Sequence, residues 1–211
     1  MSSQPSQPVA YIIDDDEAVL DSLSLFLQAT GLQTRTYTDP RNFLAEHHSG
    51  MSGCLILDIQ LPAISGLGLQ EELIAVGSAL PIIFITGHGD VPTAVQAMKA
   101  GAFEFIEKPF SQQALLQHIQ RAFEKDNQQR ATLGHQQQIR ERIKTLTPRE
   151  TEVLNYIVNG KASKVIAIEL SLSQRTVEIY RANIMQKMQS KSVAQLVKML
   201  SESGTSLWET R

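Results

Sequence analysis

The chain of 211 residues carries 19 Lys and Arg against 22 Asp and Glu, and 42% of its residues are hydrophobic. This length suits one medium domain with one small domain, and the hydrophobic fraction is ample for packed cores, which excludes a disordered chain. No apolar stretch reaches the length of a membrane span, and residues 1–8 lack the cationic and apolar regions of a signal peptide, so we expect a cytoplasmic protein with no membrane segment.

The charge is divided unevenly along the chain. Residues 1–143 carry 9 Lys and Arg against 16 Asp and Glu, a net charge of −7, whereas residues 144–211 carry 10 against 6, a net charge of +4. An acidic front part and a basic tail predict two domains with separate functions. The lone cysteine, Cys54, lies in the apolar run CLIL, where a buried, inert thiol is favoured over a disulfide or a nucleophile.

In the front part, short runs rich in branched residues alternate with helical patterns. The runs predict buried strands at 9–13, 53–57 and 81–85, with weaker strands at 33–37 and 103–106. The intervening patterns predict helices from Val19 to Gly31, from Asp39, and over residues 66–77, 91–100 and 111–123. This alternation predicts an α/β fold with a doubly wound, five-stranded parallel sheet of the flavodoxin-like class.

Polar residues stand where the predicted strands end. Asp14 and Asp15 follow the first strand, Asp58 ends the third, Thr86 ends the fourth and Lys108 ends the fifth. Because the carboxyl ends of parallel strands meet at one edge of a sheet, we expect these side chains to converge there. Three carboxylates around one point suit a hard cation such as Mg²⁺, whereas a solvated acidic loop is the simpler alternative.

Such an edge has the parts needed for phosphoryl transfer. A bound Mg²⁺ would relieve the repulsion among the carboxylates and steady an incoming phosphoryl group. Lys108 and the hydroxyl of Thr86 would contact the other phosphoryl oxygens, which leaves Asp58 as the nucleophile that forms an aspartyl phosphate.

Residues 8–123 resemble a two-component receiver domain, and the segment ITGHGDVPTAVQAMKAGAFEFIEKPF resembles the FixJ branch of response regulators. The resemblance is carried by the acidic pair, the aspartate of LILDIQLP, the threonine and the lysine of EKPF. It implies that a sensor histidine kinase phosphorylates Asp58. It also implies that Asp15, Asp58 and the backbone carbonyl of Gln60 bind Mg²⁺, that Asp14 acts mostly through water, and that the Lys108–Pro109 peptide bond is cis.

Thr86 and Phe105 are switch residues if the receiver resemblance holds. On composition alone, a threonine at a strand end and a phenylalanine in a short strand are more often packing residues. The resemblance implies that the hydroxyl moves toward the phosphoryl group while the aromatic ring swings inward, and Gly87 would leave room for that group. Gln60 and His88 occupy positions that tune hydrolysis in receivers, although His88 fits a solvent-facing loop equally well.

Residues 124–143 have the composition of a linker, rich in Gln and charge and poor in large apolar side chains. Helix-compatible residues dominate despite Gly134, so we expect a semi-rigid helical spacer, with a flexible coil as the alternative. Leu133 and Ile139 are too sparse to predict a coiled coil.

The basic tail begins with TPRE at 147–150, in which a Thr cap, a Pro and a Glu form a predicted capping box. Short helices follow through 164–170 and 174–188, separated by a tight turn. This arrangement predicts a small all-α helix-turn-helix domain. An amphipathic helix alone does not indicate DNA binding, but the regional charge raises the expectation.

Residues 144–200 resemble the LuxR-type helix-turn-helix, through LTPRETEVL, IAIELSLSQRTVEIYRANIMQKM and SVAQLV. The resemblance implies that the helix at 174–188 enters the major groove. Residues implied to lie near base edges are Glu178, Ile179 and Ala182, and those implied to lie near phosphates are Thr176, Arg181 and Lys187. The chain departs from the family pattern at Tyr180, Ser171 and Ser163, which leaves the turn geometry and one phosphate contact open.

A last helix is predicted over residues 192–200. Its apolar stripe consists of Val193, Leu196, Val197 and Leu200. In a small domain this stripe is either core or a dimer surface, and family members commonly pair through this helix, so we expect it to support dimerisation.

The two resemblances together imply a response regulator of the NarL/FixJ family. Its domains are a receiver at 1–123, a linker at 124–143 and a DNA-binding domain at 144–211. We expect a homodimer on phosphorylation, promoter DNA as partner and RNA polymerase as a further candidate partner, with no enzymatic activity beyond the receiver's own phosphotransfer and dephosphorylation. Competing hypotheses are a Mg²⁺ phosphohydrolase, a flavin or nucleotide binder, and a DNA-binding protein that is not switched.

Overall fold

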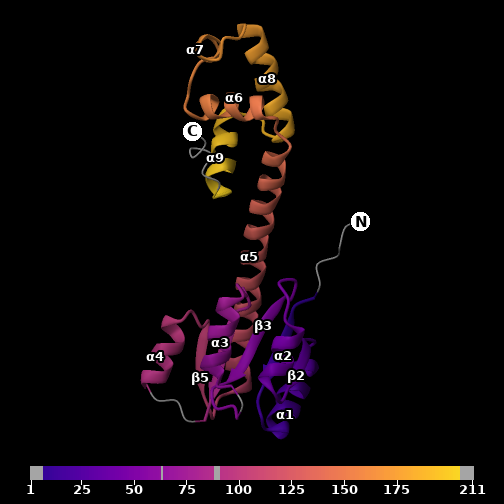
Figure 1. The fold of residues 1–211 in the computed structure, drawn as a ribbon. Helices are drawn as coiled ribbons and strands as arrows, with labels where there is room; N and C mark the ends of the chain where they lie inside the picture. The colour runs from indigo at the N-terminus through magenta and orange to yellow at the C-terminus, as the bar shows by residue number, and fades with distance from the viewer. Residues whose placement is uncertain (1–6, 63, 88–90, 205–211) are drawn as a thin grey trace. The chain divides into compact units, whose positions relative to one another are not determined.

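The computed structural model describes residues 7–62, 64–87 and 91–204, which form two compact units (Figure 1). The first unit is Met1–Arg130 and the second is Ala131–Arg211. No helix within the described ranges is long and apolar enough to cross a membrane.

The first unit contains the predicted parallel sheet. Its strands are β1 (Val9–Ile13), β2 (Gln33–Tyr37), β3 (Gly53–Asp58), β4 (Ile82–Thr86) and β5 (Glu104–Glu107). They lie in the order β2-β1-β3-β4-β5, and each neighbouring pair is parallel. Strands β3 and β4 are buried along their whole length, as expected for central strands covered on both faces. The α/β prediction is confirmed.

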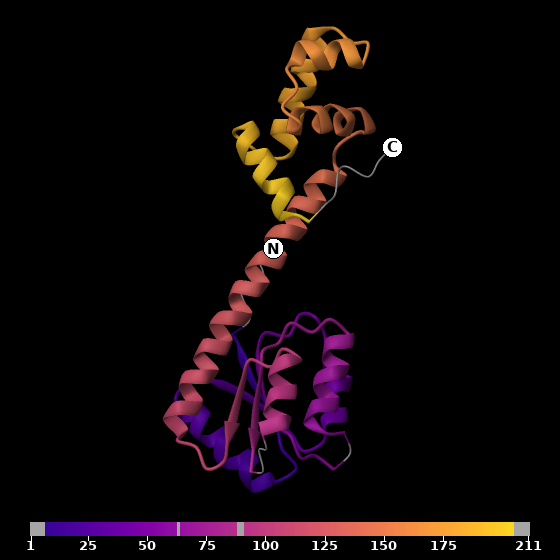
Figure 2. The same cartoon turned by 90° about the vertical axis from the view of Figure 1, so that its left-hand side faces the viewer.

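Helices cover both faces of this sheet (Figure 2). They are α1 (Glu17–Ala29), α2 (Pro40–Glu46), α3 (Gly66–Ala75), α4 (Val91–Lys99) and α5 (Gln112–Lys144). Helices α1 and α5 pack on one face through residues such as Leu27 and Ile119. The other face is covered by α2, α3 and α4 through residues such as Phe43, Leu69 and Ala97. Two separate apolar layers therefore hold the sheet.

The second unit is helical, as predicted. After the end of α5 it contains α6 (Pro148–Val158), α7 (Ser163–Glu169), α8 (Gln174–Lys187) and α9 (Val193–Glu202). The predicted capping box is present, because the Thr147 hydroxyl accepts from the Glu150 amide while the Glu150 carboxylate accepts from the Thr147 amide. Leu154, Ile166 and Ile184 meet in the core of this small domain.

The predicted linker is helical, but it does not stand apart from the two units. Helix α5 runs unbroken through residues 124–143, which confirms the helical alternative over the coil. Asp126 is buried in the first unit and Ile139 is fully buried in the second, whereas Leu133 is 55% exposed. Linker composition does not reveal such buried side chains, and the domain limits at 123 and 144 stay a prediction.

Two glycines give opposite predictions for stability. Gly53 has a φ of 130°, and an added Cβ would lie 1.9 Å from the backbone oxygen of Val9. We expect Gly53→Ala to destabilise the first unit by about 2 kcal/mol or more, because neither the backbone angle nor the space suits a side chain.

Gly134 lies in α5 with open space around it among the described residues, so Gly134→Ala should stabilise the second unit by roughly 0.5–1 kcal/mol. The free energy of unfolding in urea measures both changes. Equal changes in the two variants would contradict the different backbone surroundings of Gly53 and Gly134.

Candidate functional site

The predicted side chains do converge at the carboxyl edge of the sheet. Asp14 follows β1, Asp58 ends β3, Thr86 ends β4 and Lys108 follows β5. Asp14 and Asp58 are only 4% and 9% exposed, and Thr86 is fully buried. Because each residue stands at the end of a parallel strand, the fold itself brings them together.

Lys108 bridges the two buried carboxylates. Its ammonium nitrogen lies 2.8 Å from Oδ2 of Asp58 and 3.0 Å from Oδ2 of Asp14. The other oxygen of Asp58 accepts from the backbone amide of Gln60 at 2.9 Å, and that of Asp14 accepts from the amide of Asp16 at 3.0 Å. The Lys108–Pro109 peptide bond is cis, which confirms that prediction.

The electrostatics of the site follow from burial. Desolvation raises the pKa of Asp14, and the hydrogen bonds from Asp16 and Lys108 offset only part of this effect. Desolvation opposes the charge on Lys108, yet its hydrogen bonds to Asp58 and Asp14 outweigh that effect and raise its pKa. The ammonium is therefore firmly charged, while Asp14 is a carboxylate whose charge the fold disfavours and further positive charge would stabilise.

The residue types fit Mg²⁺, although the structure does not gather all of the predicted ligands. Asp14, Asp58 and the backbone carbonyl of Gln60 offer the oxygen donors that this ion prefers. Asp15 is exposed beside them on the loop after β1, and within the described ranges no group of three acidic, histidine or cysteine side chains is close enough to hold a metal. The predicted ligand set therefore stays a prediction, which requires Asp15 to turn inward.

The two predicted switch residues lie close to this edge. Phe105 is half-buried on β5, and its ring centroid lies 6.5 Å from that of Phe84 on β4. An added Cβ on Gly87, directly after Thr86, would meet no atom of the described residues within 4 Å, which agrees with the predicted room for a phosphoryl group. His88, predicted to tune hydrolysis, lies outside the described residues.

Asp14→Asn tests the electrostatics of the site. A carboxyl group whose pKa is raised by folding lowers stability as the pH rises above its ordinary value of 3.8, because the folded state then binds the proton more tightly than the unfolded state does. Near neutral pH without Mg²⁺, we expect the variant to be more stable than the parent chain by about 0.5–1 kcal/mol. The gain should vanish in acid.

Thermal melts at neutral and acidic pH measure this difference. Asp21→Asn, which changes an exposed carboxylate on α1, is the control and should show little change at either pH. If Asp14→Asn were less stable than the parent chain at neutral pH, burial would not be the effect that raises the pKa of Asp14.

Helix α8 presents the predicted base-facing residues to solvent. Glu178 and Ala182 are exposed, and Ile179 is 55% exposed despite being apolar. Val177 and Ile184 point into the core and are fully buried. The helix therefore has an inner face that holds the domain and an outer face that is free to meet a groove in DNA.

The three residues predicted to contact phosphate have different surroundings. Arg181 is half-buried. The hydroxyl of Thr176 lies 2.7 Å from that of Ser173, the N-cap of α8. The ammonium of Lys187 lies 2.6 Å from the buried carboxylate of Glu150 and 3.2 Å from the Thr145 carbonyl oxygen. Since an ammonium has three donors, a phosphate contact by Lys187 stays a prediction, but its first role is internal.

The turn before α8 contains Ser171, one of the residues that depart from the family pattern. Ser171 has a φ of 54°, a left-handed conformation that normally favours glycine. Its amide donates to the Ile168 carbonyl, and the Leu172 amide donates to the Ala167 carbonyl at 2.8 Å. The turn thus keeps a glycine-like backbone with a serine in place. Ser163 begins α7, whose N-cap Ala162 makes no side-chain hydrogen bond.

Two of the four members of the predicted stripe on α9 are core residues, and the role of the stripe in dimerisation stays a prediction. Leu196 and Leu200 are 0% and 7% exposed and belong to the core of the second unit. Val193 is partly buried against the same core, and Val197 is 37% exposed. A domain this small needs most of the stripe for its own packing, so only Val197 and part of Val193 remain for an interface.

Glu150 has a structural role beyond the predicted capping box, because its buried carboxylate also pairs with Lys187. Although desolvation opposes its charge, hydrogen bonds from Lys187 and Thr147 lower its pKa. Arg142 also donates to the Met188 carbonyl at 3.4 Å. These contacts tie the end of α5, the start of α6 and the last turn of α8 together. The sequence pattern TPRE predicted that Glu150 caps α6, but no pattern in the sequence predicted its contact with Lys187.

Glu150→Gln should weaken this junction. A carboxylate whose pKa is lowered by folding contributes stability above its ordinary value of 4.5, and this contribution is lost as the pH falls below that value. We expect a loss of about 1 kcal/mol at neutral pH that shrinks in acid. Glu152→Gln, at a carboxylate that is 51% exposed, is the control. Denaturation across the pH range measures both, and a pH-independent loss would contradict the role of the charge.

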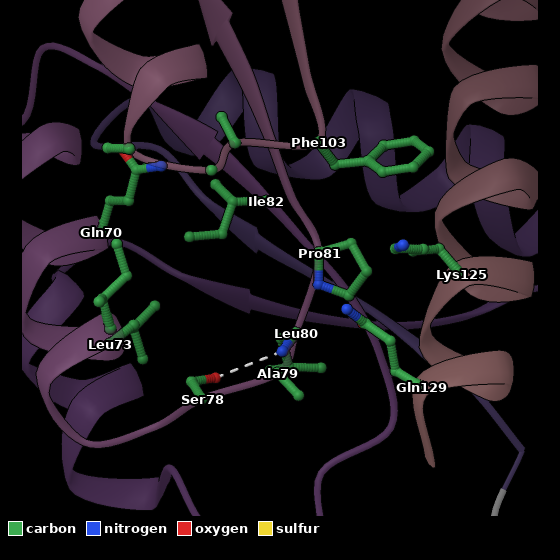
Figure 3. A pocket seen from close by; sticks show the side chains of 14 residues that line it. Gln70, Leu73, Ser78, Ala79, Leu80, Pro81, Ile82, Phe103, Lys125 and Gln129 are labelled. Atoms are coloured by element: carbon green, nitrogen blue, oxygen red, sulfur yellow. Dashed lines mark hydrogen bonds between the residues drawn. The ribbon is translucent and has the colours of Figure 1, made fainter. Parts of the chain in front are cut away.

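A separate pocket of about 420 Å³ lies at the opposite end of β4 from the phosphoryl site. Figure 3 shows Gln70 and Leu73 on one side and Lys125 and Gln129 reaching from α5 toward Pro81 on the other. Among the described residues that line it, none is acidic. The pocket therefore does not belong to the acidic site, and Lys125 and Gln129 of α5 form part of its lining.

Two family models match the chain, and together they span most of it. The response regulator receiver domain matches residues 10–120, and the luxR family of bacterial regulatory proteins matches residues 144–200.

Relatives match over nearly the whole chain. Response regulator protein TodT of Pseudomonas putida is 41% identical over 199 residues, covering 94% of this chain and 88% of its own length. Transcriptional regulatory protein FixJ of Rhizobium meliloti is 42% identical over 194 residues, covering 92% and 95%. The solved structure of response regulator StyR aligns with a TM-score of 0.86 at 39% identity, covering 93% of this chain and 100% of that one. Full-length FixJ from B. japonicum aligns with a TM-score of 0.56 at 38% identity, covering 93% and 97%.

Proposed function

Because the chain belongs to the NarL/FixJ family of response regulators, with a receiver domain and a LuxR-type DNA-binding domain, we propose that it is a transcription regulator switched by phosphorylation of Asp58. The observation that carries this proposal is the Lys108 ammonium, held 2.8 Å from the Asp58 carboxylate at the edge of the sheet. The proposed donor is a sensor histidine kinase, and the proposed location is the cytoplasm.

The chemistry is an in-line transfer to a carboxylate. An oxygen of Asp58 forms a bond to phosphorus while the bond from phosphorus to the imidazole nitrogen of the kinase breaks, and that nitrogen takes up a proton. Bound Mg²⁺ would supply positive charge to the phosphoryl oxygens. Because Lys108 already contacts Asp58, its ammonium would stabilise the negative charge on the phosphoryl oxygens during the transfer. The Gln60 amide donates to the second oxygen of the Asp58 carboxylate and holds it in place.

The proposed switch ends in association of two receivers. Phosphorylation would favour a state in which the Thr86 hydroxyl approaches the phosphoryl group and Phe105 turns inward. Helix α4 offers an apolar surface for pairing, because Val91, Val95 and Met98 are 75%, 45% and 44% exposed. Exposed apolar side chains at helical spacing on one element are typical of an interaction surface.

Pairing would then raise the affinity for DNA. Two weakly binding domains held in one dimer engage two half-sites with a much higher effective concentration than either domain alone. In each domain the exposed face of α8, with Glu178, Ile179 and Ala182, would enter the major groove of promoter DNA. RNA polymerase is a further proposed partner at such a promoter.

A Mg²⁺ phosphohydrolase is the competing function for the same site. It would need an acid and base beside the nucleophile, and Gln60 stands two residues after Asp58 where a carboxylate could serve. An amide cannot exchange a proton in this way, so we propose no enzymatic activity beyond phosphotransfer to Asp58 and its hydrolysis. Steady turnover of a small phosphate ester would favour the competing function.

Phosphorylation can be tested with small donors. With Mg²⁺ and acetyl phosphate, we expect a phosphoryl adduct in the intact mass of the parent chain, and with beryllofluoride a shift from monomer to dimer in light scattering. Asp58→Asn should show neither, because it lacks the nucleophile. Asp39→Asn, at a carboxylate that caps α2, should behave like the parent chain. An adduct on Asp58→Asn, or dimers that ignore beryllofluoride, would contradict the proposed switch.

A further inference from the structure

A buried carboxylate lies outside the phosphoryl site and has no role in its chemistry. Asp126, on α5, is 1% exposed. Burial of a charged carboxylate is unfavourable unless hydrogen-bond donors compensate for the lost water, so its partners matter.

The donors come from two parts of the first unit. The Ser52 hydroxyl lies 3.1 Å and the Gly53 amide 2.9 Å from Oδ2 of Asp126. The Arg130 guanidinium, one helical turn further along α5, lies 3.0 Å from both carboxylate oxygens. Every one of these partners is a donor and one is a cation, so the contacts compensate the buried carboxylate for the water that it loses.

These contacts reach the strand that carries the phosphoacceptor. Gly53 is the first residue of β3, and Asp58 is its last. Strand β3 lies between β1 and β4 in the middle of the sheet. The linker end of α5 is therefore hydrogen-bonded to the backbone of the strand whose other end holds Asp58.

Asp126 also continues the stripe by which α5 packs on the sheet. The buried apolar residues on α5 that precede it are Leu115, Ile119 and Ala122. Asp126 takes the next position at helical spacing, where the apolar contacts end and Glu124, Lys125 and Asn127 beside it are exposed. A helix of mostly exposed residues is marginal in water, so this polar contact decides how far α5 stays on the receiver.

We propose that Asp126 is the anchor of the linker helix and that it couples the receiver to DNA binding. The carboxylate keeps residues 123–130 of α5 on the sheet, so that the first unit ends at Arg130 rather than at Ala122. Without it, this stretch frays, the linker gains free length, and phosphorylation proceeds without its full effect on DNA binding. This coupling rests on the function proposed above, whereas the anchoring does not.

Asp126→Asn in the full chain tests the anchor. The amide keeps the shape but presents an N–H₂ group to donors. We expect amide hydrogen exchange over residues 123–130 to rise about tenfold or more, while exchange over 112–119 stays unchanged. Glu124→Gln, at an exposed carboxylate two residues earlier on α5, is the matched control and should leave both segments unchanged.

The coupling is tested with the same proteins and beryllofluoride. Asp126→Asn should form the beryllofluoride dimer as the parent chain does, but its gain in DNA affinity should be several times smaller. Unchanged exchange over 123–130, or an equal rise over 112–119, would overturn the anchor. A full gain in DNA affinity despite fraying would overturn the coupling.

A milder variant covers the case in which Asp126→Asn does not fold. Ser52→Ala removes one donor and leaves the Gly53 and Arg130 contacts, so we expect a smaller rise in exchange confined to the same segment. No rise in this variant would overturn the anchor. If the parent chain itself does not respond to beryllofluoride, the proposed function fails, while the exchange comparison, made without any phosphoryl donor, still decides the anchor.

Discussion

The ammonium of Lys108 between Asp14 and Asp58 is the interaction on which the site depends. Two carboxylates brought to one buried edge repel each other, and the fold tolerates them because a cation lies 3.0 Å and 2.8 Å away. That arrangement holds the Lys108 ammonium in direct contact with the Asp58 carboxylate. A nucleophile and the group that would stabilise the phosphoryl charge are thus held ready by the same ion pair.

Much of this could be predicted from the sequence, because the strands are short, apolar and followed by polar residues. The carboxyl-edge rule alone placed Asp14, Asp58, Thr86 and Lys108 together, since it depends only on parallel strands. The capping box at Thr147 was readable for a similar reason, because its partners are close in the sequence. Local spacing and the polar residues at the ends of apolar runs can be seen in one sequence.

Contacts between distant residues could not be predicted in this way. Asp126 reads as one more charge in a polar linker, and only the fold shows that Ser52 and Gly53 lie against it. The apolar stripe on α9 was compatible with both a core and a dimer surface, and Leu196 is fully buried in the core of its own domain. Asp15 shows the opposite case, because its sequence position indicates a metal ligand while its side chain lies in solvent. Whether such a side chain is buried depends on which distant residues pack against it, and the periodicity of the sequence does not show those residues.

The ammonium signal of Lys108 in NMR spectra of nitrogen-labelled protein tests the central claim most directly. An ammonium held by two buried carboxylates exchanges its protons slowly enough to be observed, and its resonance should shift when beryllofluoride and Mg²⁺ bind at Asp58. The account predicts this shift in the parent chain and its absence in Asp58→Asn. A Lys108 resonance that stays unchanged while beryllofluoride binds would contradict the claim that this ion pair is the starting point of the switch.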